Sequence, residues 1–129
     1  MLKKIQSKKS PKAIGPYSQA ISIPANQRLI FVSGHLPIDP ETGELVQGDI
    51  RVQTQRVLAS LEAVLAEAGS SFDRVTRCDV FLKDIRDFAA MNEEYAKKFN
   101  GEAPPARQTV EVSALPKGAL IEISCIAVG

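Results

Sequence analysis

The chain has few of the histidine and cysteine side chains from which zinc and iron centres are built. Its 129 residues include one histidine, His35, and two cysteines, Cys78 and Cys125. The cysteines are far apart and form no Cys-x-x-Cys pair, so the ligand spacing of a zinc site is absent. Both cysteines lie in apolar segments, which predicts buried free thiols, and so few cysteines fit a reducing compartment.

Long hydrophobic runs and a dominant charge are also lacking. No run reaches the ~18 apolar residues that a membrane-spanning helix needs, and no apolar segment follows the N-terminal lysines. We therefore expect a cytoplasmic protein. Lysine and arginine number 16 against 15 acids, a net charge of +1, and the lysines at residues 3–9 are interpreted as a solvated tail. This balance argues against a nucleic-acid surface, which needs a clustered basic field.

Motifs of several enzyme classes are missing as well. No glycine-rich loop leads into a helix to bind phosphate. The segment Ser33-Gly34-His35 lacks the strand–nucleophile–helix pattern of a hydrolase elbow. The segment Asp39–Glu44 predicts a turn, and it lacks the spacing of a calcium-binding loop. We expect no metal or organic cofactor, and we interpret His35 as a hydrogen-bonding residue at the edge of a cleft.

The residues that are present predict one α+β domain over residues 1–129. Hydrophobic residues make up 44% of the chain, which is enough for a core. Asp49 and Asp87 are predicted helix N-caps, and Gly69 is a predicted helix stop. After a polar arm (1–16), apolar periodicity predicts strands at 18–23 and 29–33 joined as a hairpin, a helix at 49–68, a strand at 74–82, a helix at 87–99, and strands at 107–112 and 120–128.

The last predicted strand carries apolar residues on both of its faces. The residues of the two faces are Ile121, Ile123 and Ala127 against Leu120, Ile126 and Val128. Two helices can cover one face of the sheet, and the other face is too apolar to remain in contact with water. The pattern therefore predicts an obligate oligomer, although it does not give the number of subunits.

Arg107 and Glu122 are the charged residues of the C-terminal strands that need an explanation. Arg107 follows Pro104-Pro105 at a strand entrance, and Glu122 lies within the most apolar strand, where burying an unpaired acid is costly. One interpretation is a structural ion pair between the two. The other is a site for a small organic acid, because a guanidinium binds a carboxylate through two parallel hydrogen bonds. Strand alternation places Arg107, Thr109 and Glu111 on one face.

Short segments along nearly the whole chain match one known family in the same order. They are Pro105-Ala106-Arg107, Val110-Glu111-Val112, Leu115-Pro116-Lys117 and Ile121-Glu122-Ile123 near the C-terminus, and Ile14-Gly15-Pro16-Tyr17-Ser18-Gln19-Ala20, Val32-Ser33-Gly34 and Phe81-Leu82-Lys83-Asp84 before them. These segments resemble the Rid (YjgF) family of reactive-intermediate deaminases. The resemblance implies a chorismate-mutase-like α+β fold, with two helices on one face of a mixed sheet. It also implies a homotrimer with clefts between subunits.

The resemblance further implies roles for individual residues. Arg107 matches the arginine that binds the substrate carboxylate, and Glu122 matches the acid that positions or activates water. Tyr17 matches an aromatic residue whose hydroxyl can serve the reacting nitrogen. The substrate-binding positions, in chain order, are Ser33, Phe88, Asn92, Arg107 and Thr109.

Four positions qualify this assignment. Phe88, matched as an apolar wall, also lies on the apolar stripe of its helix and could equally be a core residue. Thr109 stands where deaminating members often have cysteine, and its hydroxyl can still contact a ligand. Ser124 stands where the family often has an acid, and His35 where glutamine is usual.

The implied reaction is hydrolysis of a 2-imino acid, such as 2-iminobutanoate or 2-iminopropanoate, or of its enamine tautomer. The products are a 2-oxo acid and ammonia, and the implied partners are this small molecule and other copies of the chain. One alternative is a module that binds or senses a 2-oxo acid without turnover, which Thr109 favours. Another is a ribonuclease or translation inhibitor, which the balanced charge disfavours.

Overall fold

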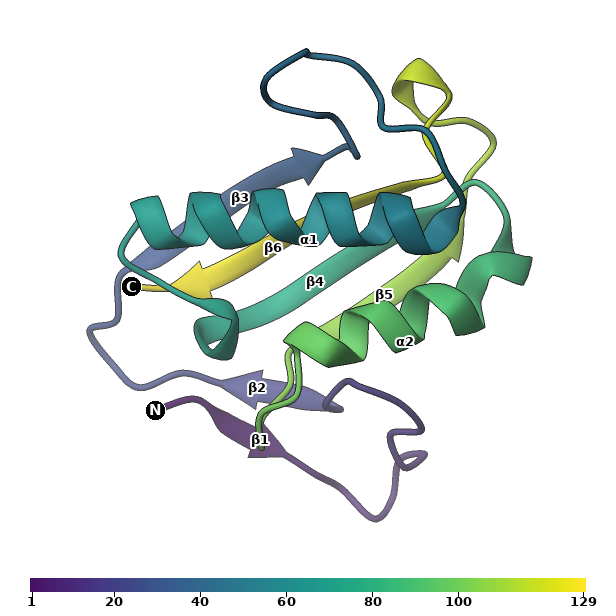
Figure 1. Cartoon of the computed structure of the whole chain (residues 1–129). Helices are drawn as coiled ribbons and strands as arrows, with labels where there is room; N and C mark the ends of the chain where they lie inside the picture. Colours follow the sequence, from purple (N-terminus) through teal and green to yellow (C-terminus); the bar gives the residue numbers. More distant parts are fainter.

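Two helices cover one face of a four-stranded sheet, and a separate pair of short strands lies beyond one edge (Figure 1). The structure is a computed structural model that describes residues 1–129. Its elements are β1 (Lys3–Ile5), β2 (Ala20–Ser22), β3 (Leu29–His35), α1 (Ile50–Glu67), η1 (Phe72–Arg74), β4 (Val75–Leu82), η2 (Ile85–Asp87), α2 (Phe88–Lys98), β5 (Ala106–Glu111), η3 (Pro116–Gly118) and β6 (Ile121–Val128). The predicted α+β fold with two helices on one face is confirmed.

The main sheet is mixed, with strand order β3-β6-β4-β5. β4 and β5 are parallel, while β6 runs antiparallel to both β3 and β4. A parallel pair needs a crossover, and α2 supplies it between β4 and β5. The order leaves β5 at one edge of the sheet and β3 at the other.

The first helix forms where its capping and periodicity predict it. The Asp49 carboxylate accepts a hydrogen bond from the Val52 amide at 3.1 Å, which satisfies a donor at the helix start. Gly69 follows the helix in the left-handed region, with φ of +78°, where a residue without Cβ is unstrained. The stripe facing the sheet is buried and includes Val57, Leu58, Leu61 and Leu65.

The second helix starts where it was predicted, but the predicted capping hydrogen bond is absent. Asp87 occupies the N-cap position, yet its side chain makes no capping hydrogen bond. Asp84 instead accepts from the Arg86 amide at 2.9 Å and caps the preceding turn, η2. The side-chain capping bond is therefore made one turn before the predicted residue, because a short 3₁₀ turn precedes the helix. Met91 and Tyr95 are buried, whereas Phe88 remains 36% exposed.

The predicted N-terminal hairpin is wrong. The strand predicted at 18–23 is the shorter β2 in the structure, and it pairs with β1, with Lys4 opposite Ile21. β3 pairs with β6 instead, with Val32 opposite Cys125. Residues 3–5, expected to belong to a polar tail, thus form a strand. Their pairing partner lies more than ten residues away, so local periodicity carried no information about it.

The core lies between the helices and one face of the sheet. Its fully buried members include Val57, Leu61, Leu65, Val80, Leu82, Ile121 and Ile123. Of the three residues predicted to make the opposite face apolar, Ile126 lies on it, and the other two contribute little exposed surface. Val128 is buried, and Leu120 precedes β6 and packs against the core. Phe31, which pairs with Ile126 on the uncovered face, is 71% exposed.

The uncovered face is therefore apolar mainly at the β3 edge, where Leu29 is also 47% exposed. The obligate oligomer predicted from this apolar face stays a prediction. No helix in the structure combines the length and the apolar character needed to cross a membrane.

Candidate functional site

The position of Arg107 follows from the register of the edge strand. In the parallel β4–β5 pair, Arg107 lies opposite Cys78, which is fully buried beneath the helices. Side chains at paired positions share a face of the sheet, so Arg107 points to the helical side. Because β5 is an edge strand, the guanidinium lies in the core layer but close to its border.

One helix face supplies most of the surroundings of Arg107. Asn92 Oδ1 accepts a hydrogen bond from Arg107 at 2.5 Å. The guanidinium carbon lies 4.7 Å from the centre of the Tyr95 ring and 5.6 Å from that of Phe88. These three residues are spaced by three and four positions, which aligns them on one side of α2. Helix α2 therefore fixes the orientation of the guanidinium.

The loop before β2 contributes a further aromatic ring. The centre of the Tyr17 ring lies 5.7 Å from the guanidinium carbon of Arg107. The neighbouring Ser18 hydroxyl donates a hydrogen bond to the Pro104 carbonyl at 2.5 Å, which ties this loop to the entrance of β5. Three rings thus surround one cation at distances at which the charge interacts favourably with aromatic faces.

No acidic side chain neutralises Arg107. The five ion pairs of the chain involve Arg51, Arg77, Arg86 and Lys97, and none involves Arg107. Burial away from water lowers the pKa of the Arg107 guanidinium. A half-buried cation with one amide acceptor and no carboxylate partner has unused donors for an anion. A carboxylate fits this fork best, because it can accept two parallel hydrogen bonds.

Glu122 lies away from Arg107 and its neighbours. It pairs with Phe81 across the β4–β6 ladder, whereas the alternate β6 residues Ile121 and Ile123 face the core. Glu122 therefore lies on the uncovered face, opposite to the face of Arg107. The interpretation of Arg107 and Glu122 as a structural ion pair within one chain is wrong for this reason. Only Arg107 and its neighbours form a cluster within a single copy.

The remaining predicted residues divide between the helical face of the sheet, which carries Arg107, and the uncovered face, which carries Glu122. Thr109 shares the helical face with Arg107, two positions further along β5, and its hydroxyl oxygen is buried without a hydrogen-bond partner. Ser33 is exposed on β3, three strand positions from β5, or roughly 14 Å at the usual strand spacing. His35 Nδ1 lies 2.7 Å from the Ser33 carbonyl oxygen.

The seven predicted residues thus fall into two groups. Tyr17, Phe88, Asn92, Arg107 and Thr109 belong to the helical face near the β5 edge, while Ser33 and Glu122 belong to the other face, toward β3. The sheet separates the groups. One copy of the chain therefore cannot bring all seven side chains to one small ligand.

Tyr95 is a member of the Arg107 cluster that the sequence did not reveal. Its place on the apolar stripe of α2 predicted only a core residue, and it does stack on Phe99 at 4.3 Å between ring centres. Its spacing of three residues from Asn92 was the available indication. Burial raises the pKa of the Tyr95 phenol, so this hydroxyl stays protonated beside Cys78.

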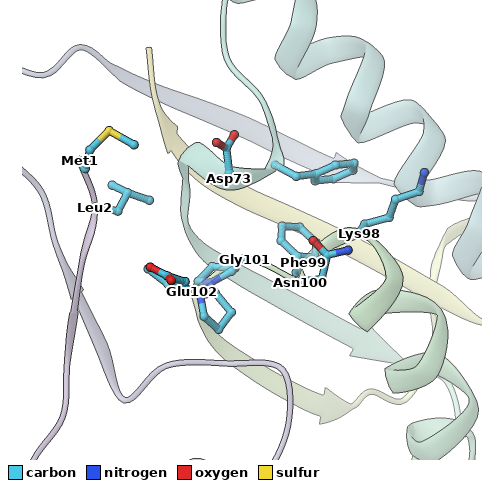
Figure 2. A pocket seen from close by; sticks show the side chains of 12 residues that line it. Met1, Leu2, Asp73, Lys98, Phe99, Asn100, Gly101 and Glu102 are labelled. Carbon is cyan, nitrogen blue, oxygen red and sulfur yellow. The ribbon is translucent and has the colours of Figure 1, made fainter.

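A separate hollow lies at the other end of α2 (Figure 2). It has a volume of about 410 Å³ and is lined by Met1, Leu2, Phe99 and the loop that follows α2. Arg107 is not among its lining residues. The chain has no group of three or more His, Cys, Asp or Glu side chains that could hold a metal ion.

Comparison with known proteins gives consistent matches over almost the full chain. The family model described as Endoribonuclease L-PSP matches residues 7–129. The chain is 54% identical over 126 residues to Protein DfrA of Myxococcus xanthus, covering 98% of this chain and 95% of that protein. It is 41% identical over 126 residues to a Mus musculus protein named 2-iminobutanoate/2-iminopropanoate deaminase, covering 98% and 90%.

Solved structures agree with these matches. YyfA of Yersinia pestis, described as a member of the conserved Rid protein family, aligns with a TM-score of 0.77 and 46% identity over 100% of both chains. TdcF of E. coli, solved with bound serine, aligns with a TM-score of 0.74 and 36% identity over 98% of each chain.

Proposed function

Because the chain belongs to the Rid family, which the matching family model describes as Endoribonuclease L-PSP, we propose that it hydrolyses reactive 2-imino acids to 2-oxo acids and ammonia. The proposed substrates are 2-iminobutanoate and 2-iminopropanoate, with their enamine tautomers. The names of the rodent relatives, which are 41% and 44% identical to this chain, support this choice.

The observation that carries the proposal is the unpaired guanidinium of Arg107. It is half-buried among three aromatic rings, is oriented by Asn92, and has no acidic partner. A small carboxylate would complete its hydrogen bonds. The E. coli relative TdcF was solved with serine, a small amino acid that carries such a carboxylate.

The separation of Arg107 from Glu122 supports a site made by two copies of the chain. Arg107 lies near the β5 edge on the helical face, and Glu122 lies near β3 on the uncovered face. In the proposed homotrimer, the β5 side of one copy meets the uncovered face of the next. Arg107, Asn92 and Tyr17 of one copy and Glu122 and Ser33 of its neighbour then face the same ligand.

The chemistry needs few groups, because imines already hydrolyse in water. Arg107 holds the carboxylate, and Glu122 of the neighbouring copy takes a proton from a water whose oxygen bonds to the imine carbon. The Tyr17 hydroxyl donates a proton to the imine nitrogen as its double bond opens. Glu122 then returns its proton to the nitrogen of the tetrahedral adduct, the adduct hydroxyl gives its proton to the Tyr17 phenolate, and the carbon–nitrogen bond breaks to release ammonia and leave the 2-oxo acid.

A binding module without turnover is the second candidate. The Arg107 cluster is complete without Glu122 within one copy, so a 2-oxo acid could be bound by that cluster alone. Thr109 in the place where deaminating relatives often have cysteine also favours this candidate. The ribonuclease implied by the description of the family model is weaker, since the chain carries a net charge of only +1.

A direct assay separates these candidates. A pyridoxal-phosphate dehydratase acting on threonine or serine generates the imine, and its disappearance is followed with and without the protein. Faster loss of the imine supports the deaminase. Binding of 2-oxobutanoate with no acceleration supports the binding module, and cleavage of a mixed RNA substrate would support the ribonuclease.

A further inference from the structure

A glycine on β3 lies directly against the carboxylate of Glu122. We infer that Gly34 is a positioning residue, whose missing side chain creates the space in which the Glu122 carboxylate is held for reaction. The inference deepens the proposed function and rests on it for the role of Glu122. The steric observation itself does not depend on the reaction.

The contact is too close for any side chain. A Cβ atom added to Gly34 would lie 1.9 Å from Glu122 Oε2, 2.9 Å from its carboxyl carbon and 3.3 Å from its Cγ. Nonbonded carbon and oxygen atoms do not approach below about 3 Å, since attraction is optimal near 3.5–4.0 Å. Alanine at position 34 would therefore displace the carboxylate.

The backbone conformation at position 34 does not require a glycine. The residues of the chain with positive φ include five glycines, and Gly34 is not among them. Any residue could adopt the conformation of Gly34, so its lack of a side chain serves another purpose. The close approach of the Glu122 carboxylate is the feature that a side chain would disturb.

The local strand geometry produces this approach. The β3–β6 register shifts between Val32 and His35, so that Ser33 and Gly34 form a bulge beside Glu122. A bulge inserts extra backbone into one strand and changes the direction of the side chains around it. No ion pair holds Glu122, and the side chain of its cross-strand neighbour Phe81 has no hydrogen-bond donor. Contact with the Gly34 backbone therefore has a large part in placing the carboxylate.

The effect of filling this space should fall on activity more than on stability. The displaced atoms are the far end of a flexible side chain on a partly solvated face, so they can rotate away at small cost to the fold. For Gly34→Ala we expect imine hydrolysis to fall at least tenfold, while 2-oxobutanoate binding through Arg107 changes less than twofold. The melting temperature should stay within a few degrees of the wild type.

Gly101→Ala is the matched control. Gly101 also has no positive φ, and a Cβ there meets no atom within 4 Å. This variant should retain wild-type turnover. In a Glu122→Ala background, where the carboxylate is gone, Gly34→Ala should cause no further loss of turnover. A further loss there, or a large drop in melting temperature for Gly34→Ala, would overturn the positioning role in favour of a structural one.

A spectroscopic measurement decides the inference even if the wild type has no turnover. The carboxyl carbon resonance of Glu122, assigned by its absence in Glu122→Ala, is compared in the wild type, Gly34→Ala and Gly101→Ala. Displacement of this carboxylate predicts that its resonance shifts in Gly34→Ala and not in Gly101→Ala. An unshifted resonance in Gly34→Ala would overturn the inference, whereas absent wild-type turnover with a shifted resonance would overturn only the proposed reaction.

Discussion

At the scale of single residues, the central feature is a guanidinium held without an acid. Arg107 is oriented by an amide and three rings, an arrangement that leaves its charge unneutralised until an anion binds. The fork of arginine is planar, and its shape matters as much as its charge. Substitution by lysine separates these two properties.

Arg107→Lys should weaken 2-oxobutanoate binding by about 1.5–3 kcal/mol, the range for one lost hydrogen bond to a charged group. This is roughly a 10- to 150-fold rise in Kd, and imine hydrolysis should fall with it. Titration calorimetry and the imine assay measure the two effects. Arg86→Lys, at an exposed arginine paired with Asp84, is the control and should leave both unchanged. Intact binding in Arg107→Lys would contradict the proposed carboxylate site.

The sequence revealed the types of these residues better than their spatial relation. Alternation along β5 correctly placed Thr109 on the face of Arg107, because that rule depends on one strand alone. Whether Glu122 shares that face depends on which strands are neighbours and in what register. Those pairings join residues that are distant in sequence, so no local pattern could exclude an Arg107–Glu122 ion pair.

At the scale of elements, two sides of helix α2 make different contacts. One side carries Asn92 and Tyr95 toward Arg107, and another carries Glu94 toward α1. Glu94 is 4% exposed and accepts hydrogen bonds from Gln55 at 2.9 Å and Arg51 at 3.0 Å, both on α1. The hydrogen bonds of Glu94 that join α1 to α2 therefore also hold the Arg107 cluster in position.

The hydrogen bond from Gln55, with further contributions from Lys97 and Arg51, lowers the pKa of Glu94 to about 2. A carboxyl whose pKa falls on folding stabilises the protein above its unfolded pKa of about 4.3, and the stabilisation is lost as the pH falls toward 2. Glu94→Gln should therefore reduce the free energy of unfolding at pH 7 by about 1.5–3 kcal/mol. It should also flatten the loss of stability between pH 4.5 and 2.

Urea unfolding across this pH range measures both effects. The control is Glu93→Gln, which removes the exposed partner of Arg51 and should change stability by less than about 0.5 kcal/mol. An acid-induced loss of stability in Glu94→Gln as steep as in the wild type would contradict the role of this network.

Elements with local causes were also the ones predicted best. The cap at Asp49 and the stripe through Leu61 are features of one continuous segment, and α1 formed within one residue of its predicted ends. The pairing of β1 with β2 has no such cause, since Lys3–Ile5 is short and mostly polar. Its existence depends on a partner strand that the chain reaches only after an intervening loop.

At the scale of the whole molecule, the uncovered face of the sheet is the main unexplained surface. Phe31 and Leu29 leave apolar area in water in a single copy, and Phe81 and Ile126 continue it across the sheet. Exposed apolar surface of this kind marks interfaces between proteins. Glu122 lies on the same face, which links the question of assembly to that of activity.

Phe31→Glu should convert the proposed trimer to smaller species at micromolar concentration, because a charge would replace a ring in the buried interface. Sedimentation velocity measures the change, and imine hydrolysis should be lost with the trimer. Val64→Glu, at an exposed apolar position on α1, is the control and should leave the trimer intact. A wild-type chain that sediments as a monomer would contradict the assembly itself.

The sheet that separates Arg107 from Glu122 has a genetic consequence. If each site takes one residue from each of two subunits, two inactive variants can repair each other when they share a trimer. Arg107→Lys and Glu122→Gln subunits, each with strongly reduced activity alone, should recover activity after co-refolding at equal amounts. Every mixed trimer then has one intact interface out of three, so random mixing should restore roughly a quarter of wild-type activity. Sites contained within single subunits would show no such complementation.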